Sequence, residues 1–289
     1  MSYVKPGAHG FDSFAFCVIA AVGLFMNVAK ALGAPNIVTI LLDDVGYSDM
    51  TCYGGIYAST PVLDRLANEG LRFTDFYSSM ALCSPTRSSI QTGRLPIRNG
   101  FYSNAHFGRN AVASQFVDGG LPATENTIAE LLAAAGYRTA LIGKSHLGFQ
   151  PKYWPDQLGF QETLGSPGCH FVRPNLPETP GIPVIRNASM IGRYYEGEWA
   201  INRTSGESNI TRMFADAAVD FVTRSARFAD PFYLYFTPDG THAPAYASKQ
   251  FLGKSPRGIY GDSMTEVDFS IGRVLDALDE AGIRNNTLV

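Results

Sequence analysis

The sequence predicts an α/β fold in which a mixed, mostly parallel central sheet carries helices on both faces. Helical patterns alternate along the chain with short apolar runs, as expected when the strands of a sheet are buried on both sides. The 289 residues are 45% hydrophobic and 17% charged, a composition typical of a folded globular protein with a substantial core.

The first 34 residues stand apart from this pattern and are predicted to be a secretory signal peptide. An apolar run from Phe14 to Met26 follows Lys5 and precedes small residues near position 30, which is the layout of a cleavable signal. The run is shorter than the ~20 apolar residues that a membrane span needs, and an uncleaved signal anchor is the alternative. We therefore assign residues 1–34 to the signal and residues 35–289 to the folded domain.

The folded domain is predicted to begin with a buried strand and a capped helix. Asn36 to Leu42 is a continuous apolar run that ends abruptly at Asp43, which indicates a strand buried on both faces. Thr60-Pro61 then opens a helical pattern that closes at Gly70. A capping threonine, a proline at the first position and a terminal glycine are the signals of helix boundaries.

The alternation continues through the rest of the chain. The predicted elements are a helix from Thr124 to Ala135, a strand over Thr139–Ile142, a helix over Asn209–Arg224, a strand over Phe232–Phe236, a helix over Met264–Glu280 and the start of a strand at Thr287–Val289. Such alternation favours parallel strands joined by crossover helices. The pattern is lost between Gly165 and Gly206, where we expect an irregular surface or pocket-rim loop.

The charge and the cysteines narrow the classes of function. A net charge of −3 without a Lys/Arg run argues against a nucleic-acid-binding surface. Outside the signal, three cysteines remain, Cys52, Cys83 and Cys169, and this odd number predicts a free or modified thiol in an oxidising compartment. Secretory passage is also supported by four glycosylation sequons. They begin at Asn187, Asn202, Asn209 and Asn285.

Polar side chains follow three of the predicted strands, at the edge where ligands bind in open α/β sheets. Asp43 and Asp44 follow the first strand; adjacent carboxylates suit Ca²⁺ or Mg²⁺, and a solvated turn is the alternative. Lys144 and His146 follow the second strand, and His242 follows the third. Each of them alone is compatible with an ordinary loop, but their occurrence at successive strand ends predicts a site.

The most informative stretch is Cys83-Ser84-Pro85-Thr86-Arg87, which has no obvious packing role. We predict that Cys83 precedes a helix from Pro85 to Gln91, closed by Gly93, whose N-terminal N–H groups would face an anion. Arg87, in the first turn, can form a bidentate contact with the carboxylates. A buried structural cysteine beside a turn is the alternative interpretation.

The spacing C-x-P-x-R at Cys83 resembles the signature of the type I sulfatases, whose cysteine is oxidised to formylglycine, an aldehyde that acts on sulfate esters as its hydrate. The Asp43-Asp44 pair, the G-K-x-H-L-G loop and the T-H-x-P histidine match the same pattern. The resemblance runs from Pro35 nearly to the C-terminus and implies an alkaline-phosphatase-like sulfatase fold and a sulfuric ester hydrolase. It is closest to members that act on 6-sulfates of N-acetylgalactosamine and galactose in chondroitin and keratan sulfates, through CSPTRSSIQTGRLPIRNGFY, GSPGCHF, IGRYYE and THAPAYASKQFLG.

The resemblance also implies roles for individual residues and partners for the chain. The implied roles are Ca²⁺ ligation by Asp43, Asp44 and modified Cys83, stabilisation of the hydrate by Arg87, sulfate binding by Lys144 and His242, and breakdown of the sulfated intermediate with help from His146. The implied partners are the formylglycine-generating enzyme, a sulfated glycosaminoglycan or oligosaccharide, and a second copy in a homodimer. The implied location is the lysosome, with secretion as the alternative and no membrane span in the mature chain.

Three departures from the family pattern bear on this interpretation. Ser145 stands where the close relatives carry tryptophan, and Val112, after the loop Asn104–Arg109, stands about where they have a pocket tyrosine; both concern substrate recognition more than chemistry. The chain ends at Val289, where the family's next strand brings an Asp-Asn pair to calcium, so we expect an incomplete chain that is inactive and poorly folded. A non-catalytic fragment or pseudoenzyme, and a formylglycine-dependent phosphodiesterase or phosphonate hydrolase, stay open as alternatives.

Overall fold

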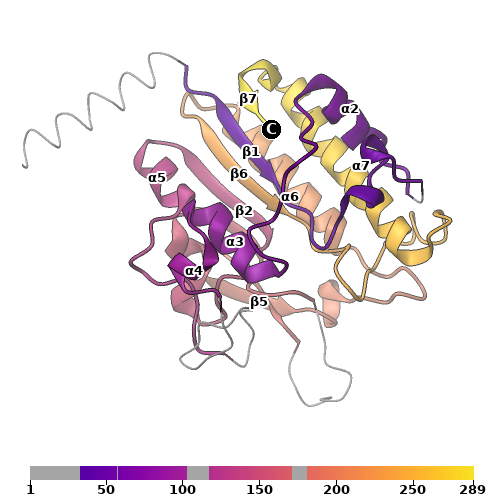
Figure 1. The fold of residues 1–289 in the computed structure, drawn as a ribbon, viewed down its shortest axis with the longest axis horizontal. Helices are drawn as coiled ribbons and strands as arrows, with labels where there is room; N and C mark the ends of the chain where they lie inside the picture. Colours follow the sequence, from indigo (N-terminus) through magenta and orange to yellow (C-terminus); the bar gives the residue numbers. More distant parts are fainter. Residues whose placement is uncertain (1–32, 57, 103–116, 171–180) are drawn as a thin grey trace, which may run out of the picture.

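A seven-stranded mixed sheet forms the centre of the molecule (Figure 1). The computed structural model describes residues 33–56, 58–102, 117–170 and 181–289. The strands are β1 (Asn36–Ile40), β2 (Arg138–Lys144), β3 (Glu162–Ser166), β4 (Pro183–Arg186), β5 (Ser189–Arg193), β6 (Phe232–Thr237) and β7 (Thr287–Leu288). Their order is β5-β4-β3-β2-β6-β1-β7. The neighbouring pairs β3–β2, β2–β6, β6–β1 and β1–β7 are parallel. Strand β4 pairs antiparallel with both β3 and β5. The predicted mixed, mostly parallel sheet is confirmed.

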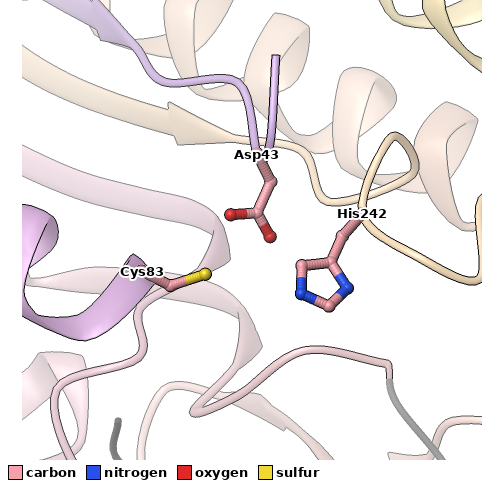
Figure 2. A group of neighbouring side chains, drawn as sticks. All are labelled: Asp43, Cys83 and His242. Carbon is pink, nitrogen blue, oxygen red and sulfur yellow. The ribbon is translucent and has the colours of Figure 1, made fainter. Parts of the chain in front are cut away.

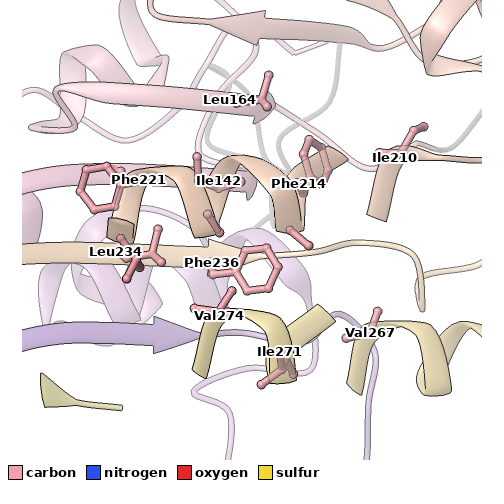
Figure 3. Close-up of a cluster of buried hydrophobic side chains, with 14 of the residues drawn as sticks. Ile142, Leu164, Ile210, Phe214, Phe221, Leu234, Phe236, Val267, Ile271 and Val274 are labelled. Carbon is pink, nitrogen blue, oxygen red and sulfur yellow. The ribbon is translucent and has the colours of Figure 1, made fainter. Parts of the chain in front are cut away.

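Helices cover both faces of this sheet, as predicted. They are α2 (Pro61–Glu69), α3 (Cys83–Thr92), α4 (Pro96–Asn99), α5 (Ile128–Ala134), α6 (Ile210–Ser225) and α7 (Gly258–Glu280). The apolar core between α6, α7 and one face of the sheet receives Leu234 and Phe236 of β6 (Figure 3). Tyr233 and Tyr235 of the same strand point into a second core, to which α3 and α5 contribute. Because successive side chains of a strand alternate in direction, β6 is buried on both sides.

Helix α2 has the predicted boundaries, but its first turn is capped from another helix. Thr60 is the N-cap residue, yet its side chain makes no cap hydrogen bond. The N–H groups of Val62 and Leu63 donate instead to the Asp268 carboxylate of α7, at 3.1 and 2.9 Å. These bonds satisfy donors that have no partner within the helix, and they tie α2 to α7.

Helix α5 begins at Ile128, several residues after the predicted start at Thr124. Thr127 is its N-cap: the Thr127 hydroxyl accepts from Glu130 N–H at 3.1 Å, and the Glu130 carboxylate accepts from Thr127 N–H at 2.7 Å. This reciprocal capping box fixes the start of the helix at that point.

The expectation of an irregular loop between Gly165 and Gly206 is wrong for its described part. The strands β4 and β5 form an antiparallel hairpin at the edge of the sheet. Its two-residue turn consists of Asn187 at φ 44° and Ala188 at φ 64°, the left-handed conformations that suit a tight hairpin. Alanine in place of the usual glycine, together with strands of only four and five residues, kept the pattern from being recognised.

Several sequence predictions concern residues outside the described ranges. The predicted signal peptide falls almost entirely on residues 1–32, and Val112 with its loop Asn104–Arg109 falls on residues 103–116. They therefore stay predictions. Within the ranges that are described, no helix has the length and apolar character required to cross a membrane.

Candidate active site

Three predicted site residues converge at the carboxyl edge of the sheet. Asp43 follows β1, Cys83 begins α3, and His242 follows β6 (Figure 2). Each of the three offers one side-chain atom that could bind a metal ion, and these three atoms lie within 4.8 Å of one another. Strands β1 and β6 pair in parallel, so their carboxyl ends, and with them Asp43 and His242, lie side by side. The structure thus brings the residues after these strands together at one edge of the sheet, as parallel strands allow.

Asp43 is the buried centre of the charges in the site. Its carboxylate lies 3.1 Å from Arg87 Nη2 and 2.5 Å from Lys144 Nζ. Arg87 Nη1 also donates to the Lys144 carbonyl oxygen at 2.6 Å, which ties α3 to the end of β2. Burial alone would raise the pKa of Asp43, but the charges of Arg87 and Lys144 outweigh it and hold that pKa well below its usual range. The carboxylate therefore stays ionised beside two cations.

Helix α3 begins at Cys83 itself, which corrects the predicted start at Pro85. Proline is tolerated within the first helical turn, where an N–H would have no intrahelical partner, so it did not mark the first position. Arg87 consequently lies one turn after Cys83, rather than in the first turn, and both side chains share one face of the helix. The helix ends at Gly93, as predicted, with φ 65°.

The pKa values of the two histidines in the site shift in opposite directions. His146 is buried, and burial, with the charge of Lys144, lowers its pKa to about 4 even though the ring is hydrogen-bonded to Cys83. Burial also acts to lower the pKa of His242, but its hydrogen bond to Cys83, together with the negative charges of Asp43 and Asp44, outweighs burial, and the net shift is upward. The Nδ1 atom of His242 lies 2.6 Å from the Ala243 carbonyl oxygen. A carbonyl can only accept, so Nδ1 carries a proton and Nε2 is the atom that faces the site.

Asp44 lies at the rim of the site and not at its centre. Its side chain is 57% exposed, and its carboxylate is 3.6 Å from His242 Nε2. Asp44 and His146 both have left-handed backbones, with φ 56° and 57°. Non-glycine residues held in this way are uncommon and concentrate at functional sites.

A cavity of about 340 Å³ gives access to the site. Its lining includes Asp43, Asp44, Cys83 and Arg87. A somewhat larger hollow, about 390 Å³, lies against α6 and β3, where Arg224 pairs with surrounding carboxylates. The smaller cavity is the candidate binding site because it reaches Cys83 and Asp43.

One thiol and one ion pair near the site were not identified from the sequence. Cys169 hydrogen-bonds to Cys83; this bond raises the pKa of Cys83 and is the main cause that lowers the pKa of Cys169 to about 7. The next residue, His170, pairs with Asp239 in the buried interior. The signal that would have found Cys169 and His170 is their place just after β3, a strand that was not predicted.

Comparisons with known proteins agree with this geometry. The family model for sulfatases matches residues 35–289. Rat N-acetylgalactosamine-6-sulfatase is 47% identical over 272 residues, which cover 94% of this chain and 51% of the rat protein. Human arylsulfatase A is 38% identical over 273 residues, covering 88% of this chain and 50% of the relative. The chain thus spans about half the length of these curated relatives.

The solved structures show the same relationship. The PsFucS1 sulfatase from Pseudoalteromonas sp. is similar at a TM-score of 0.73 and 29% identity, covering 93% of this chain and 57% of that chain. Ps i-CgsB in complex with k-i-k-neocarrahexaose is similar at a TM-score of 0.72 and 27% identity, with 88% and 57% covered. The family model matches nearly the whole chain after the first 34 residues, and the chain belongs to the sulfatase family.

Proposed function

We propose that this chain carries the nucleophile and the principal anion-binding groups of an enzyme that hydrolyses sulfate esters. The observation that carries the proposal is the position of Cys83 at the start of α3, beside the carboxylate of Asp43 and the ring of His242. The two cations that flank Asp43 add positive charge at the same place. A tetrahedral anion such as a sulfate ester is the kind of ligand that such a site attracts.

The proposed nucleophile is formylglycine derived from Cys83. When present, its hydrate supplies one hydroxyl whose oxygen attacks sulfur as the alcohol leaves, and a second whose deprotonation re-forms the aldehyde as sulfate is released. Cys83 is half-buried but lines the cavity, so a small ester can approach it. Hydrogen bonds from His146 and His242 reach the Cys83 side chain, which places two proton-carrying groups where the chemistry needs them.

The surrounding residues would stabilise charge and move protons. Lys144 is completely buried, and its ammonium next to the nucleophile would interact strongly with developing negative charge. Arg87 would hold the nucleophile side of the site through its contact with Asp43. With a pKa lowered to about 4, His146 is neutral at neutral pH and can accept a proton. His242 would present Nε2 to a sulfate oxygen.

The residues fit a divalent calcium ion in donor type, with Asp43, Asp44 and the converted Cys83 as its ligands. Carboxylates and hydroxyls are the hard oxygen donors that Ca²⁺ prefers, usually six to eight of them. A carboxylate oxygen of Asp43 lies within 4.8 Å of a His242 ring nitrogen, and the Asp44 carboxylate lies 3.6 Å from His242 Nε2. They supply only part of such a shell. When bound, the ion would supply further positive charge beside the nucleophile.

The proposed substrates are 6-sulfates of N-acetylgalactosamine or galactose in glycosaminoglycans such as chondroitin and keratan sulfates. Support comes from the mammalian relatives named N-acetylgalactosamine-6-sulfatase, 46% to 48% identical to this chain. Ser145 is buried at the end of β2, with its hydroxyl donating to the Ser166 carbonyl at 3.2 Å. A small side chain buried in this way cannot contact a substrate as a large side chain at position 145 would.

The same proposal includes the biosynthetic route and the partners. The apolar run at residues 14–26 and the four sequons support entry into the secretory pathway, where the formylglycine-generating enzyme would modify Cys83. Delivery to the lysosome and homodimer formation belong to the same proposal. Peptide mass spectrometry of material from cells that contain this enzyme tests the route, because it distinguishes an aldehyde from a thiol at position 83.

Turnover is tested in a version of the protein extended past Val289, expressed with the formylglycine-generating enzyme and assayed on an aryl sulfate and a 6-sulfated galactosamine, with calcium. We expect sulfate release by this extended version and none by its Cys83→Ala variant. Lys144→Met should lower kcat/KM, and the ratio to the wild-type value should correspond to a loss of ~2–4 kcal/mol of transition-state stabilisation. Unconverted Cys83 in secreted material, or equal release by Cys83→Ala, would contradict the proposal. An aryl phosphodiester in parallel distinguishes a phosphodiesterase from a sulfatase.

A further inference from the structure

A second buried polar cluster lies directly behind His242. Its centre is the carboxylate of Asp239, which follows β6 and is fully buried. Three side chains donate to it: His170 Nδ1 at 3.0 Å, Tyr194 Oη at 3.1 Å and Tyr246 Oη at 3.1 Å. Because all four residues are 0% exposed, we call them the sealed cluster. A ligand cannot reach this cluster from solvent, so its role must concern what it holds in place.

The hydrogen bonds of His170 fix its protonation. Its Nε2 lies 3.2 Å from the Pro244 carbonyl oxygen, and its Nδ1 faces the Asp239 carboxylate. Burial would raise the pKa of Asp239, but the charge and hydrogen bond of His170 outweigh it and lower that pKa. A carbonyl and an ionised carboxylate can only accept, so both ring nitrogens of His170 must donate. The pair is therefore an imidazolium and a carboxylate, each satisfied on every side.

The sealed cluster reaches His242 through the backbone of the segment 239–246. The His242 N–H donates to the Asp239 carbonyl at 3.0 Å, and the Tyr246 N–H donates to the Gly240 carbonyl at 3.1 Å. The ring of His170 also packs edge-on against that of His242, with centroids 5.8 Å apart and planes at 83°. Because the Tyr246 hydroxyl also donates to the Asp239 carboxylate, both ends of the segment are tied to the same buried carboxylate.

The opposite side of the segment is tied to the catalytic site. The Thr241 hydroxyl donates to the Asp43 carbonyl at 2.6 Å. His242 therefore lies between two fixed points: the backbone of Asp43, which is bonded to the neighbouring Thr241, and the backbone of Asp239, whose side chain is held in the sealed cluster. A ring held in this way needs little reorganisation when it meets an anion.

We propose that His170 and Asp239 are positioning residues that hold the His242 ring in its place in the site. The proposal rests on the proposed function in one respect, that His242 binds the sulfate group. His170 acts through the Pro244 carbonyl and its ring contact, and Asp239 acts through the backbone of His242. Neither residue touches the substrate. Partners that orient a functional histidine in this way commonly matter almost as much as the histidine itself.

The first test is spectroscopic and needs no ligand. In the full chain labelled with ¹⁵N-histidine, we expect both ring nitrogens of His170 to carry protons. In Asp239→Asn, one of them should lose its proton, and the ring signals of His242 should shift. The signals are assigned from His170→Gln and His242→Gln. A singly protonated His170 in the wild type, or unchanged His242 signals in Asp239→Asn, would overturn the proposal.

The second test measures binding of inorganic sulfate to the same chain. Asp239→Asn should weaken binding roughly tenfold, the size expected for losing one charge-assisted hydrogen-bond partner, and Tyr194→Phe should weaken it less. Tyr194→Phe retains the ion pair, so it keeps the test open if Asp239→Asn does not fold. Val222→Ala is the matched control, because it empties part of the core in the last turn of α6 without touching the sealed cluster.

The control separates positioning from general loss of stability. Val222→Ala should lower the melting temperature but leave sulfate binding unchanged. Equal weakening of binding by Val222→Ala and Asp239→Asn at matched melting temperatures would show a merely structural role and would overturn the proposal. If the wild type binds no sulfate, the proposed function fails at this site, and the ¹⁵N signals of His242 still decide whether His170 and Asp239 position it.

Discussion

Two buried carboxylates lie at the same edge of the sheet, and their surroundings differ in charge. Asp43 faces the permanent cations Arg87 and Lys144 and lines an open cavity. Asp239 faces one histidine and two tyrosine hydroxyls in a place that solvent does not reach. We call the first group, with Cys83, His146 and His242, the open cluster.

The difference shows that burial alone does not identify the functional carboxylate. In the sealed cluster one positive and one negative charge balance, and every polar atom has a partner, as a stable buried ion pair requires. In the open cluster two permanent cations face one buried carboxylate. Asp43 balances only one of the two positive charges of Arg87 and Lys144. An anion that enters from solvent can balance the other.

The largest expected effect comes from removing the carboxylate of the open cluster. Asp43→Asn would leave the Arg87 and Lys144 cations buried without a counter-charge, and we expect a loss of ~3–5 kcal/mol in the free energy of unfolding. Urea unfolding at neutral pH measures it. Asp44→Asn, at the exposed rim, is the matched control and should change stability by less than ~0.5 kcal/mol. Similar losses in both variants would remove the distinction between buried centre and rim.

A pH titration should distinguish the two clusters next. The pKa of His146 is lowered from about 6.5 to about 4 in the folded state. Its contribution is therefore fully present above pH ~6.5 and is lost as the pH falls through ~4, by up to ~3 kcal/mol. His146→Gln should flatten this slope of stability against pH, whereas Tyr194→Phe in the sealed cluster should keep it. An unchanged slope in His146→Gln would show that another group is responsible.

A smaller effect is expected from trimming the sealed cluster. Tyr194→Phe removes one of three donors to Asp239 and leaves its ion pair intact, so the free energy of unfolding should fall by ~1 kcal/mol. Thermal unfolding of the variant beside the wild type measures this. A loss as large as that of Asp43→Asn would mean that the tyrosine, rather than the histidine, compensates the buried charge.

The smallest effect is expected from a substitution outside both clusters, in the β4–β5 turn, which serves as a reference for the other variants. Ala188 occupies a left-handed position, φ 64°, in the turn between β4 and β5, where glycine is preferred. Ala188→Gly should stabilise the chain by ~0.5–1 kcal/mol and leave sulfate binding as it was. A change in binding would show that sulfate affinity follows stability in general, and the comparison of the clusters would lose its meaning.

The sequence alone was enough to identify the fold class and most of the open cluster. Alternating apolar runs and capped helices predicted β1, β2, β6 and their crossovers, because burial on two faces leaves a local trace in the order of residue types. Since parallel strands end at one edge, the polar residues after them could be expected to meet. Asp43, Lys144 and His242 do so, and Cys83 joins them through its signature spacing.

Tertiary structure decided the features that depend on distant partners. The Asp268 cap of α2 joins residues 205 or 206 positions apart, and the His170–Asp239 pair spans 69 positions. No local pattern records such bonds, because they exist only once the strand order is set. The short β4–β5 hairpin and the start of α3 at Cys83 were missed for a related reason. A brief strand or a first helical turn has too few residues for periodicity, and its neighbours in space determine where it begins.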